Sequence, residues 1–141
     1  MKRTASAQWF GDLKQGKGTL DTPSRVLEQT PYSFKTRFEN ENDTNPEELI
    51  AAAYAGCFTM AFSAFLGTRG FKPEKLATQA SLTMEQIENN WTVTEIHLET
   101  IGKIPGIDTK TFEEIADEAK VNCPISRLLN AKITLGAQLE K

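Results

Sequence analysis

Cysteine and histidine are scarce in this sequence, which has two cysteines, Cys57 and Cys123, and one histidine, His97, in 141 residues. Two cysteines are too few for the disulfide framework that stabilises small secreted domains. A structural zinc site usually takes four cysteine or histidine ligands, so these residues also make a poor zinc set. The scarcity therefore argues against both classes of protein and leaves open what the two thiols do.

Positive charge is also in short supply, because 16 lysines and arginines face 19 aspartates and glutamates, for a net charge of −3. Such a chain has no basic field that could hold a phosphate backbone, which argues against a nucleic-acid partner. Residues 1–5 include basic side chains, but no apolar stretch follows them, so we predict no signal peptide. We therefore expect a cytoplasmic protein.

The chain length suits one ordinary domain with its own core, and we see no linker, repeat or low-complexity run. We therefore predict a single domain over residues 1–141. Alternation of apolar and polar residues predicts strands, and Asn89-Asn90 predicts a turn between two of them. The predicted strands lie near residues 5–9, 19–22, 32–38, 80–84, 91–101 and 133–139. Helices are predicted near residues 45–66 and 108–119, so the fold class is α+β with mostly antiparallel pairing.

The first predicted helix has a well-marked start and an unusual composition. Asn45 can cap it, Pro46 suits its first position, and Glu48 completes a pattern typical of a capping box. Residues 49–66 carry no charge, and 18 such residues reach the length of a membrane helix. Small residues fill much of this stretch, and no aromatic belt or basic cluster flanks it. We therefore expect a core helix that protein covers on all faces, and no membrane partner.

The two cysteines differ in their predicted surroundings. Cys57 lies in the middle of the apolar helix, where a buried thiol is ordinarily an inert packing residue with a raised pKa. A reactive Cys57 would need a cation nearby. Cys123 precedes Pro124 and so lies at a predicted helix start, where amides and the helix dipole stabilise a thiolate. The alternatives are packing residues and a reactive pair in which one thiol attacks and the other resolves.

Glu47 and Arg37 are the charged candidates for a site around Cys57. Glu47 lies ten residues before Cys57, which is roughly 15 Å along one helix, so the two cannot touch within that helix. If both serve one site, the acid comes from a second copy of the chain, which favours a homodimer. Arg37 lies beside Lys35 in the strand predicted over residues 32–38, on the face opposite the aromatic side chains. It could lower the pKa of Cys57, and its rivals are Arg25, Arg69 and Arg127.

Three segments together resemble the OsmC (osmotically inducible protein C) family of thiol peroxidases, and the resemblance covers essentially the whole chain. The segments are Thr44-Asn45-Pro46-Glu47-Glu48-Leu49, Ala55-Gly56-Cys57-Phe58 and Cys123-Pro124-Ile125-Ser126. The resemblance implies an intertwined homodimer in which sheets wrap around long central helices. It also implies a peroxidatic Cys57, a resolving Cys123, a catalytic Glu47 and an activating Arg37, for which Arg25 is the alternative in a sister branch of organic hydroperoxide resistance proteins.

The function implied by this resemblance is the reduction of organic hydroperoxides through a Cys57 sulfenic acid and a Cys57–Cys123 disulfide. A dithiol, in the family typically a lipoylated carrier protein, would then reduce the disulfide, with no metal, flavin or haem. Several apolar neighbours could favour an alkyl or lipid hydroperoxide, although each is explained better as core. They are Phe38, Phe58, Phe62, Ile125 and Leu128. Two alternatives stay open: a non-catalytic protein that binds a small apolar ligand and has redox-sensitive cysteines, and a general dithiol–disulfide reductase.

Overall fold

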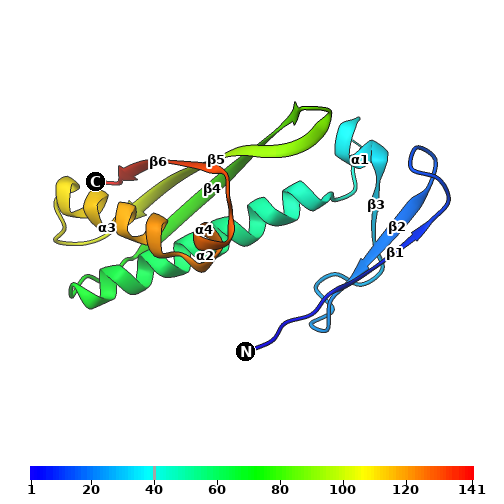
Figure 1. The fold of residues 1–141 in the computed structure, drawn as a ribbon. Helices are drawn as coiled ribbons and strands as arrows, with labels where there is room; N and C mark the ends of the chain where they lie inside the picture. The colour runs from blue at the N-terminus through cyan, green and yellow to red at the C-terminus, as the bar shows by residue number, and fades with distance from the viewer. Residues whose placement is uncertain (40) are drawn as a thin grey trace. The chain divides into compact units, whose positions relative to one another are not determined.

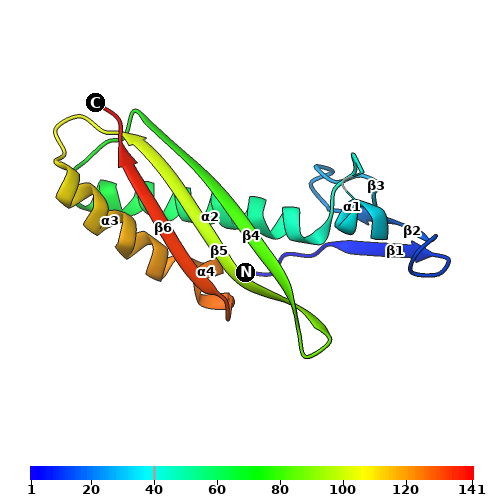
Figure 2. The ribbon, with the colours of Figure 1, turned by 90° about the horizontal axis from the view of Figure 1, so that it is seen from above.

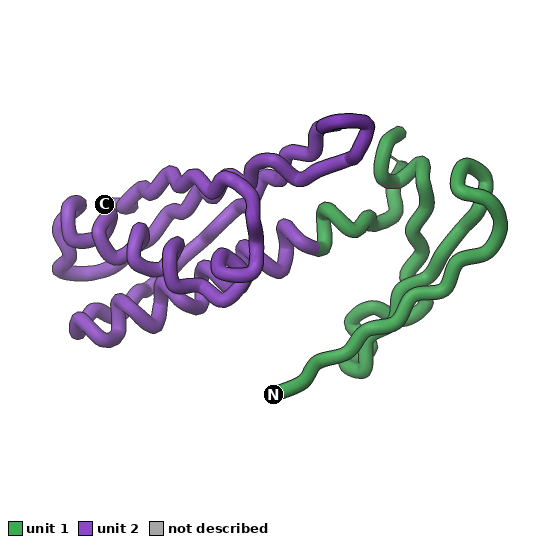
Figure 3. The backbone as a smooth tube through the Cα atoms, viewed as in Figure 1, with its two compact units in different colours: residues 1–49 green, residues 50–141 purple. Residues whose placement is uncertain are grey.

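The structure, a computed structural model, describes residues 1–39 and 41–141, which form two compact units (Figure 3). Unit 1 comprises residues 1–49 and unit 2 residues 50–141. Each unit has a three-stranded sheet of its own. The expectation of a single domain over residues 1–141 stays a prediction.

Unit 1 is built on an antiparallel sheet of strands β1 (Ser6–Phe10), β2 (Lys17–Asp21) and β3 (Thr30–Ser33), in that order (Figure 1). The strands predicted near residues 5–9 and 19–22 are confirmed as β1 and β2. Gly18 of β2 lies opposite Tyr32 of β3, and a Cβ at this glycine would lie 2.4 Å from the tyrosine ring. The sheet therefore requires glycine at this position.

The strand predicted over residues 32–38 is wrong in its second half, because Phe34–Phe38 forms a short helix, α1. Ser33 caps this helix by accepting a hydrogen bond from the Thr36 amide, and the Thr36 hydroxyl accepts one from the Ser33 amide. A spacing of four residues lies on one face of both a strand and a helix, so the aromatic pattern could not distinguish them. The reciprocal cap favours the helix, in which the rings of Phe34 and Phe38 pack with centroids 4.7 Å apart.

Unit 2 has a sheet of strands β4 (Lys75–Ile87), β5 (Asn90–Lys103) and β6 (Lys132–Leu139), in which β4 and β5 are antiparallel and β5 and β6 parallel. The turn between β4 and β5 is Glu88-Asn89, one residue earlier than predicted, and both of its residues have positive φ. The strands predicted near residues 80–84, 91–101 and 133–139 are confirmed. The described residues thus form a mixed α+β fold, as expected.

The helices of unit 2 lie on one face of this sheet (Figures 1 and 2). They are α2 (Pro46–Thr68, which begins in unit 1), α3 (Thr109–Asn122) and the short α4 (Pro124–Leu128). Along β4 half-buried and exposed residues alternate, as expected for a sheet covered on one side. Asp108 caps α3 by accepting a hydrogen bond from the Thr111 amide at 2.9 Å, which confirms the predicted start of this helix.

The predicted start of α2 is also confirmed, because the Asn45 side chain accepts a hydrogen bond of 2.8 Å from the Glu48 amide. The Glu48 carboxylate accepts a bond from the Thr44 hydroxyl. The helix ends at Thr68, and Gly70 follows it with a φ of +81°. The Phe71 amide then donates to the carbonyl of Leu66 at 3.0 Å, a pattern typical of a helix that ends in a left-handed residue.

The core of unit 2 lies between α2, α3 and the sheet. One stripe of α2 is fully buried there, and burial of each large side chain contributes about 1.5–3 kcal/mol. In α3 the predicted apolar face is buried, and β5 adds two aliphatic side chains. The core members are Tyr54, Phe58, Phe62 and Leu66 of α2, Phe112, Ile115, Ala116 and Ala119 of α3, and Ile96 and Leu98 of β5.

The opposite face of α2 is not covered by the other elements of unit 2. Met60 is 76% exposed, and Ala53, Gly56, Ala64 and Gly67 on the same side are exposed as well. The expectation that protein covers this helix on all faces is therefore wrong for unit 2 by itself. The reason is that the sheet and α3 reach only the stripe of large aromatic and aliphatic residues. By length and composition alone, α2 could cross a membrane, which is weak evidence because core helices have the same properties.

Candidate active site

The two free thiols of the chain meet in unit 2, although 66 positions separate them in the sequence. Cys57 lies in the middle of α2, on the border between its buried and exposed faces, and is half-buried. Cys123 is fully buried at the junction of α3 and α4. The Cys57 thiol interacts with the Cys123 side chain and with the backbone of Ile125. The fold therefore brings together the two residues from which a reactive pair was predicted.

Cys123 is held by the ends of two helices. It is the C-cap of α3, where its amide donates to the carbonyl of Ala119 at 2.9 Å, and it is also the N-cap of α4. Pro124 occupies the first position of α4, as the sequence predicts. The Arg127 amide donates to the Cys123 carbonyl at 3.2 Å. The backbone position of this thiol is thus fixed from both sides.

Burial raises the pKa of the Cys57 thiol above its ordinary value. The hydrogen bond with Cys123 raises this pKa further, whereas the backbone hydrogen bond from Ile125 lowers it. Among the described residues, the groups that set this pKa include no cation. The surroundings of Cys57 in unit 2 therefore favour the protonated thiol, and a positive charge nearby would favour the thiolate.

Arg37 and Glu47, the two predicted charged site residues, form an ion pair within unit 1. Arg37 lies in the last turn of α1 and donates to Oε1 of Glu47, in the first turn of α2, at 2.5 Å. The Arg37 guanidinium also lies over the ring of Phe38, 5.6 Å from its centroid. The expectation that Arg37 faces away from the aromatic residues is wrong, because residues 34–38 are helical and not extended.

The second oxygen of the Glu47 carboxylate is unusual. Oε2 is buried and accepts no hydrogen bond within the described part of the chain. A buried carboxylate oxygen without a donor costs free energy, so such atoms generally have a partner in the functional state. The Glu47 carboxylate is therefore satisfied at Oε1 by Arg37 and left without a donor at Oε2 in the described part of the chain.

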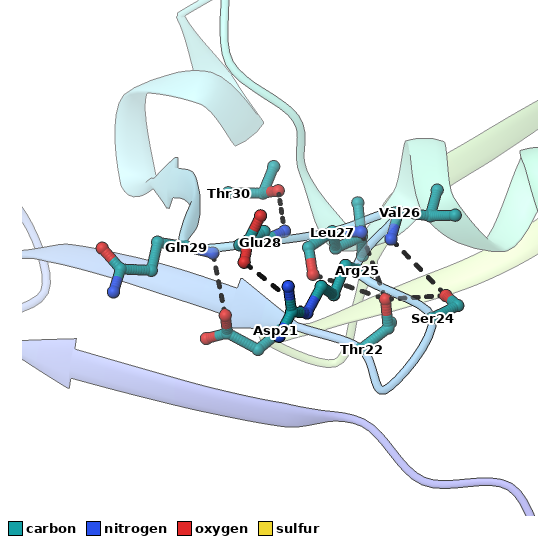
Figure 4. Close-up of polar contacts among 9 residues, drawn as sticks. All are labelled: Asp21, Thr22, Ser24, Arg25, Val26, Leu27, Glu28, Gln29 and Thr30. Atoms are coloured by element: carbon teal, nitrogen blue, oxygen red, sulfur yellow. Dashed lines mark hydrogen bonds and ion pairs between the residues drawn. The ribbon is translucent and has the colours of Figure 1, made fainter.

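The other arginines considered for the site lie elsewhere. Arg25 lies in the loop between β2 and β3, is 81% exposed and pairs with Glu28 at 4.0 Å (Figure 4). Arg69 follows α2 and donates to Glu118 of α3 at 2.8 Å. Arg127 lies in the last turn of α4 with an exposed side chain. Of the four candidates, Arg37 is the one that pairs with Glu47 in the described residues.

Two further residues at the thiol pair were missed by the sequence analysis. The hydroxyl of Tyr54, one helical turn before Cys57, lies 2.7 Å from that of Ser126, three residues after Cys123. Tyr54 is fully buried, and burial is the main reason that its pKa is raised. The two residues are 72 positions apart, so no local pattern connects them. The sequence feature that could have pointed to this contact is a tyrosine in a helix rich in small residues, one turn before Cys57.

His97, to which the sequence analysis gave no role, bonds through Nδ1 to the hydroxyl of Thr134 in the sheet of unit 2. No group of three or more histidine, cysteine, aspartate or glutamate residues within the ranges 1–39 and 41–141 could hold a metal ion. Of the predicted apolar neighbours of the site, Phe58 and Phe62 are core residues, Ile125 is half-buried, and Leu128 is 75% exposed.

Comparison with known proteins decides the family. Residues 39–137 match the OsmC family, described as "OsmC-like protein". The chain belongs to this family. It is 48% identical over 138 residues to "Peroxiredoxin OsmC" of Escherichia coli (strain K12), a match that covers 98% of this chain and 96% of the other. It is 31% identical to an "Organic hydroperoxide resistance protein-like" protein of Mycoplasma pneumoniae, over 71% of this chain and 70% of that one.

The OsmC fold of the chain is also evident from solved structures. An OsmC-like protein from Vibrio cholerae superposes with a TM-score of 0.79, over 97% of this chain and 99% of that chain, at 16% sequence identity. At such low identity the match establishes the fold alone. It agrees with the mixed α+β architecture described above and with the family to which the sequence matches point.

Proposed function

We propose that this OsmC family member is a thiol peroxidase that reduces organic hydroperoxides to alcohols. The observation that carries the proposal is the contact between two free thiols from distant parts of the chain, one half-buried and the other fully buried. A hydroperoxide can reach the half-buried Cys57 more readily than Cys123, so we assign the attack to Cys57 and the resolution to Cys123. The relatives named peroxiredoxin and organic hydroperoxide resistance protein support this reaction.

In the first step, the Cys57 thiolate attacks the terminal oxygen of the hydroperoxide. The O–O bond breaks, an S–O bond forms, and the departing alkoxide takes up a proton, which leaves a Cys57 sulfenic acid and an alcohol. Arg37 stabilises the thiolate and the developing negative charge, and Glu47 orients the guanidinium. In the second step, the Cys123 thiol displaces water from the sulfenic acid and forms the Cys57–Cys123 disulfide.

A dithiol returns the enzyme to its starting state by thiol–disulfide exchange, in which the dithiol is oxidised and both cysteines are reduced. A lipoylated protein is the dithiol that we favour. The cycle uses thiol chemistry throughout and calls for no metal, flavin or haem. We place the enzyme in the cytoplasm, where reducing conditions keep a reversible pair of this kind in its reduced form.

We further propose that the active enzyme is a homodimer in which Arg37 and Glu47 of one copy serve Cys57 of the other. Glu47 and Cys57 lie on one helix, ten residues and roughly 15 Å apart, so they cannot touch within it. The exposed stripe of α2 that includes Gly56 and Met60 is apolar, and a second copy of the chain would cover it. The buried, unbonded Oε2 of Glu47 is consistent with a site that a second copy completes.

Stoichiometric oxidation of the reduced protein tests the peroxidase proposal. Reduced wild type mixed with tert-butyl hydroperoxide should consume one equivalent per chain and lose both thiols in a thiol titration. Cys57→Ser should consume none, whereas Cys123→Ser should consume one equivalent and hold a sulfenic acid that a dione reagent traps. Consumption by Cys57→Ser at the wild-type rate would refute the proposal, and an inert wild type would favour the ligand-binding alternative.

A further inference from the structure

The contact between Tyr54 and Ser126 connects the two helices that present the thiols. Tyr54 precedes Cys57 by three residues in α2, and Ser126 follows Cys123 by three residues at α4. Three residues are close to one helical turn, so each hydroxyl lies on the same side of its backbone segment as the neighbouring thiol. The 2.7 Å bond between these hydroxyls therefore runs beside the sulfur–sulfur contact.

The helix α4 depends on such connections for its position. It has five residues, far fewer than an isolated helix needs to be stable in water. Its N-cap, Cys123, makes no side-chain capping hydrogen bond, and Leu128 at its end is 75% exposed. Ile125 and Leu129 pack against the core, but apolar contacts alone fix distance less strictly than a hydrogen bond does.

The Tyr54 side chain is well suited to hold α4. Its ring is fully buried in the core, so its hydroxyl has little freedom to move. Burial raises its pKa, so the hydroxyl keeps its proton over the whole physiological range. One partner of the bond is thus anchored in the longest helix of unit 2, and the other lies on the short segment that carries the resolving thiol.

We propose that the Tyr54–Ser126 hydrogen bond is a latch that holds α4 in place and thereby decides how oxidised Cys57 reacts next. With the latch closed, the Cys123 thiol remains beside the Cys57 sulfenic acid, condenses with it and releases water. With the latch open, a second hydroperoxide reaches the sulfenic acid first and oxidises it to a sulfinic acid while being reduced to an alcohol. Tyr54 and Ser126 are therefore positioning residues, and the inference rests on the peroxidase function proposed above.

The experiment compares wild type with Tyr54→Phe and Ser126→Ala, each reduced and then exposed to increasing tert-butyl hydroperoxide. Mass spectrometry of the intact protein counts the chains that end as disulfide and those that end as sulfinic acid. A hydrogen bond with a net contribution of about 1 kcal/mol corresponds to a factor of about five, so each variant should reach half-maximal sulfinic acid at about fivefold less hydroperoxide. Tyr32→Phe removes the other tyrosine hydroxyl of the chain and should match wild type.

The double variant Tyr54→Phe/Ser126→Ala shows whether the two substitutions act by breaking the same hydrogen bond or by two independent effects. It should be no more sensitive to overoxidation than either single variant, because each single change already breaks the bond. Additive effects, or single variants with the wild-type disulfide yield at every hydroperoxide concentration, would overturn the latch. If Tyr54→Phe were unstable, Ser126→Ala alone would still show whether loss of the bond increases the yield of sulfinic acid. Failure of the peroxidase proposal is recognised separately, because wild type would then form neither product.

Discussion

Arg37 donates to one oxygen of the Glu47 carboxylate at 2.5 Å, while the other oxygen of the same carboxylate is buried and accepts no hydrogen bond within the described residues. The side chain of Glu47 is 15% exposed and that of Arg37 is 38% exposed. A partly buried pair of this kind is screened less by solvent than a surface ion pair. In the proposed mechanism this pair acts on the Cys57 thiolate and on the departing alkoxide.

Glu47→Gln should slow the oxidation of the reduced protein by hydroperoxide about 10- to 100-fold, because a hydrogen bond to a charged group contributes about 1.5–3 kcal/mol. The glutamine keeps the shape of the side chain but loses the charge that orients Arg37. Stopped-flow measurement of the second-order rate constant with tert-butyl hydroperoxide tests this expectation. Glu48→Gln is the matched control, since Glu48 is bonded to Thr44 at the helix start. Equal rate constants for the two variants would remove Glu47 from the site.

Arg37→Met should move the pH dependence of Cys57 alkylation to higher pH. In its own chain, burial and the contact with Cys123 raise the pKa of Cys57, so any positive charge that acts on this thiol lowers the pKa and increases the thiolate fraction. Loss of an opposite charge nearby typically shifts a pKa by about 1–3 units. The rate of iodoacetamide labelling of Cys123→Ser, with and without Arg37→Met, gives the midpoint. An unchanged midpoint would mean that Arg37 does not face Cys57, and Arg25→Met would then be tested in the same way.

In the Arg37→Met background, where the proposed cation no longer acts on the thiol, the raised pKa of Cys57 predicts a loss of stability at alkaline pH. In the unfolded chain this thiol ionises near its ordinary pKa of about 8.5, before the folded chain does, so above that pH the unfolded state binds fewer protons. The contribution of Cys57 to the free energy of unfolding should therefore be constant below about pH 8 and fall as pH rises towards the higher pKa of the folded state. Urea unfolding of Arg37→Met/Cys57→Ala should show a weaker decline between about pH 8.5 and 10 than Arg37→Met alone. Parallel curves would contradict the raised pKa.

The sequence predicted local features well wherever one signal was unambiguous. Asn45 before Pro46 marked the start of α2, and Cys123 before Pro124 marked that of α4. The prediction that residues 32–38 form a strand was wrong for residues 34–38, because the positions of Phe34 and Phe38 fit a strand and a helix equally well. The cap formed by Ser33 was the overlooked evidence.

Long-range relationships were predictable only in part. The contact of Cys57 with Cys123 was expected because reactive thiols in one chain form a small set of possible pairs. The Tyr54–Ser126 bond was not expected, because the sequence does not show which distant hydroxyl lies next to a given residue of a buried helix. Coverage of α2 by a second chain was expected from the separation of Glu47 and Cys57, and it stays a prediction.

Gly56→Leu should weaken the proposed dimer. A Cβ at Gly56 meets nothing within 4 Å among the described residues, so a larger side chain fits unit 2 without a clash. In a dimer packed on the exposed stripe of α2, the same side chain would separate the two helices, whose close approach depends on small residues. Light scattering after size exclusion should show a lower mass for Gly56→Leu than for wild type, together with slower hydroperoxide consumption. A wild type that is monomeric and fully active would contradict the shared site.

Asn45 connects the helix of Arg37 with the helix of Glu47, and two substitutions separate its two contacts. Its Oδ1 accepts from the Glu48 amide at 2.8 Å, and its Nδ2 donates to the carbonyl of Thr36 in α1 at 3.1 Å. Asn45→Ala loses both bonds and should lower the free energy of unfolding by about 1 kcal/mol, as expected for loss of an N-cap. Asn45→Asp keeps the cap acceptor, so its stability should be close to that of wild type. An aspartate cannot donate to the Thr36 carbonyl, so Asn45→Asp should hold α1, and with it Arg37, less firmly. We therefore expect Asn45→Asp to slow the oxidation of Cys57 severalfold although its stability is unchanged. Urea unfolding and the rate constant with tert-butyl hydroperoxide, measured on both variants, distinguish the two contacts. An Asn45→Asp variant with the wild-type rate constant would show that the bond from Asn45 to Thr36 does not position Arg37.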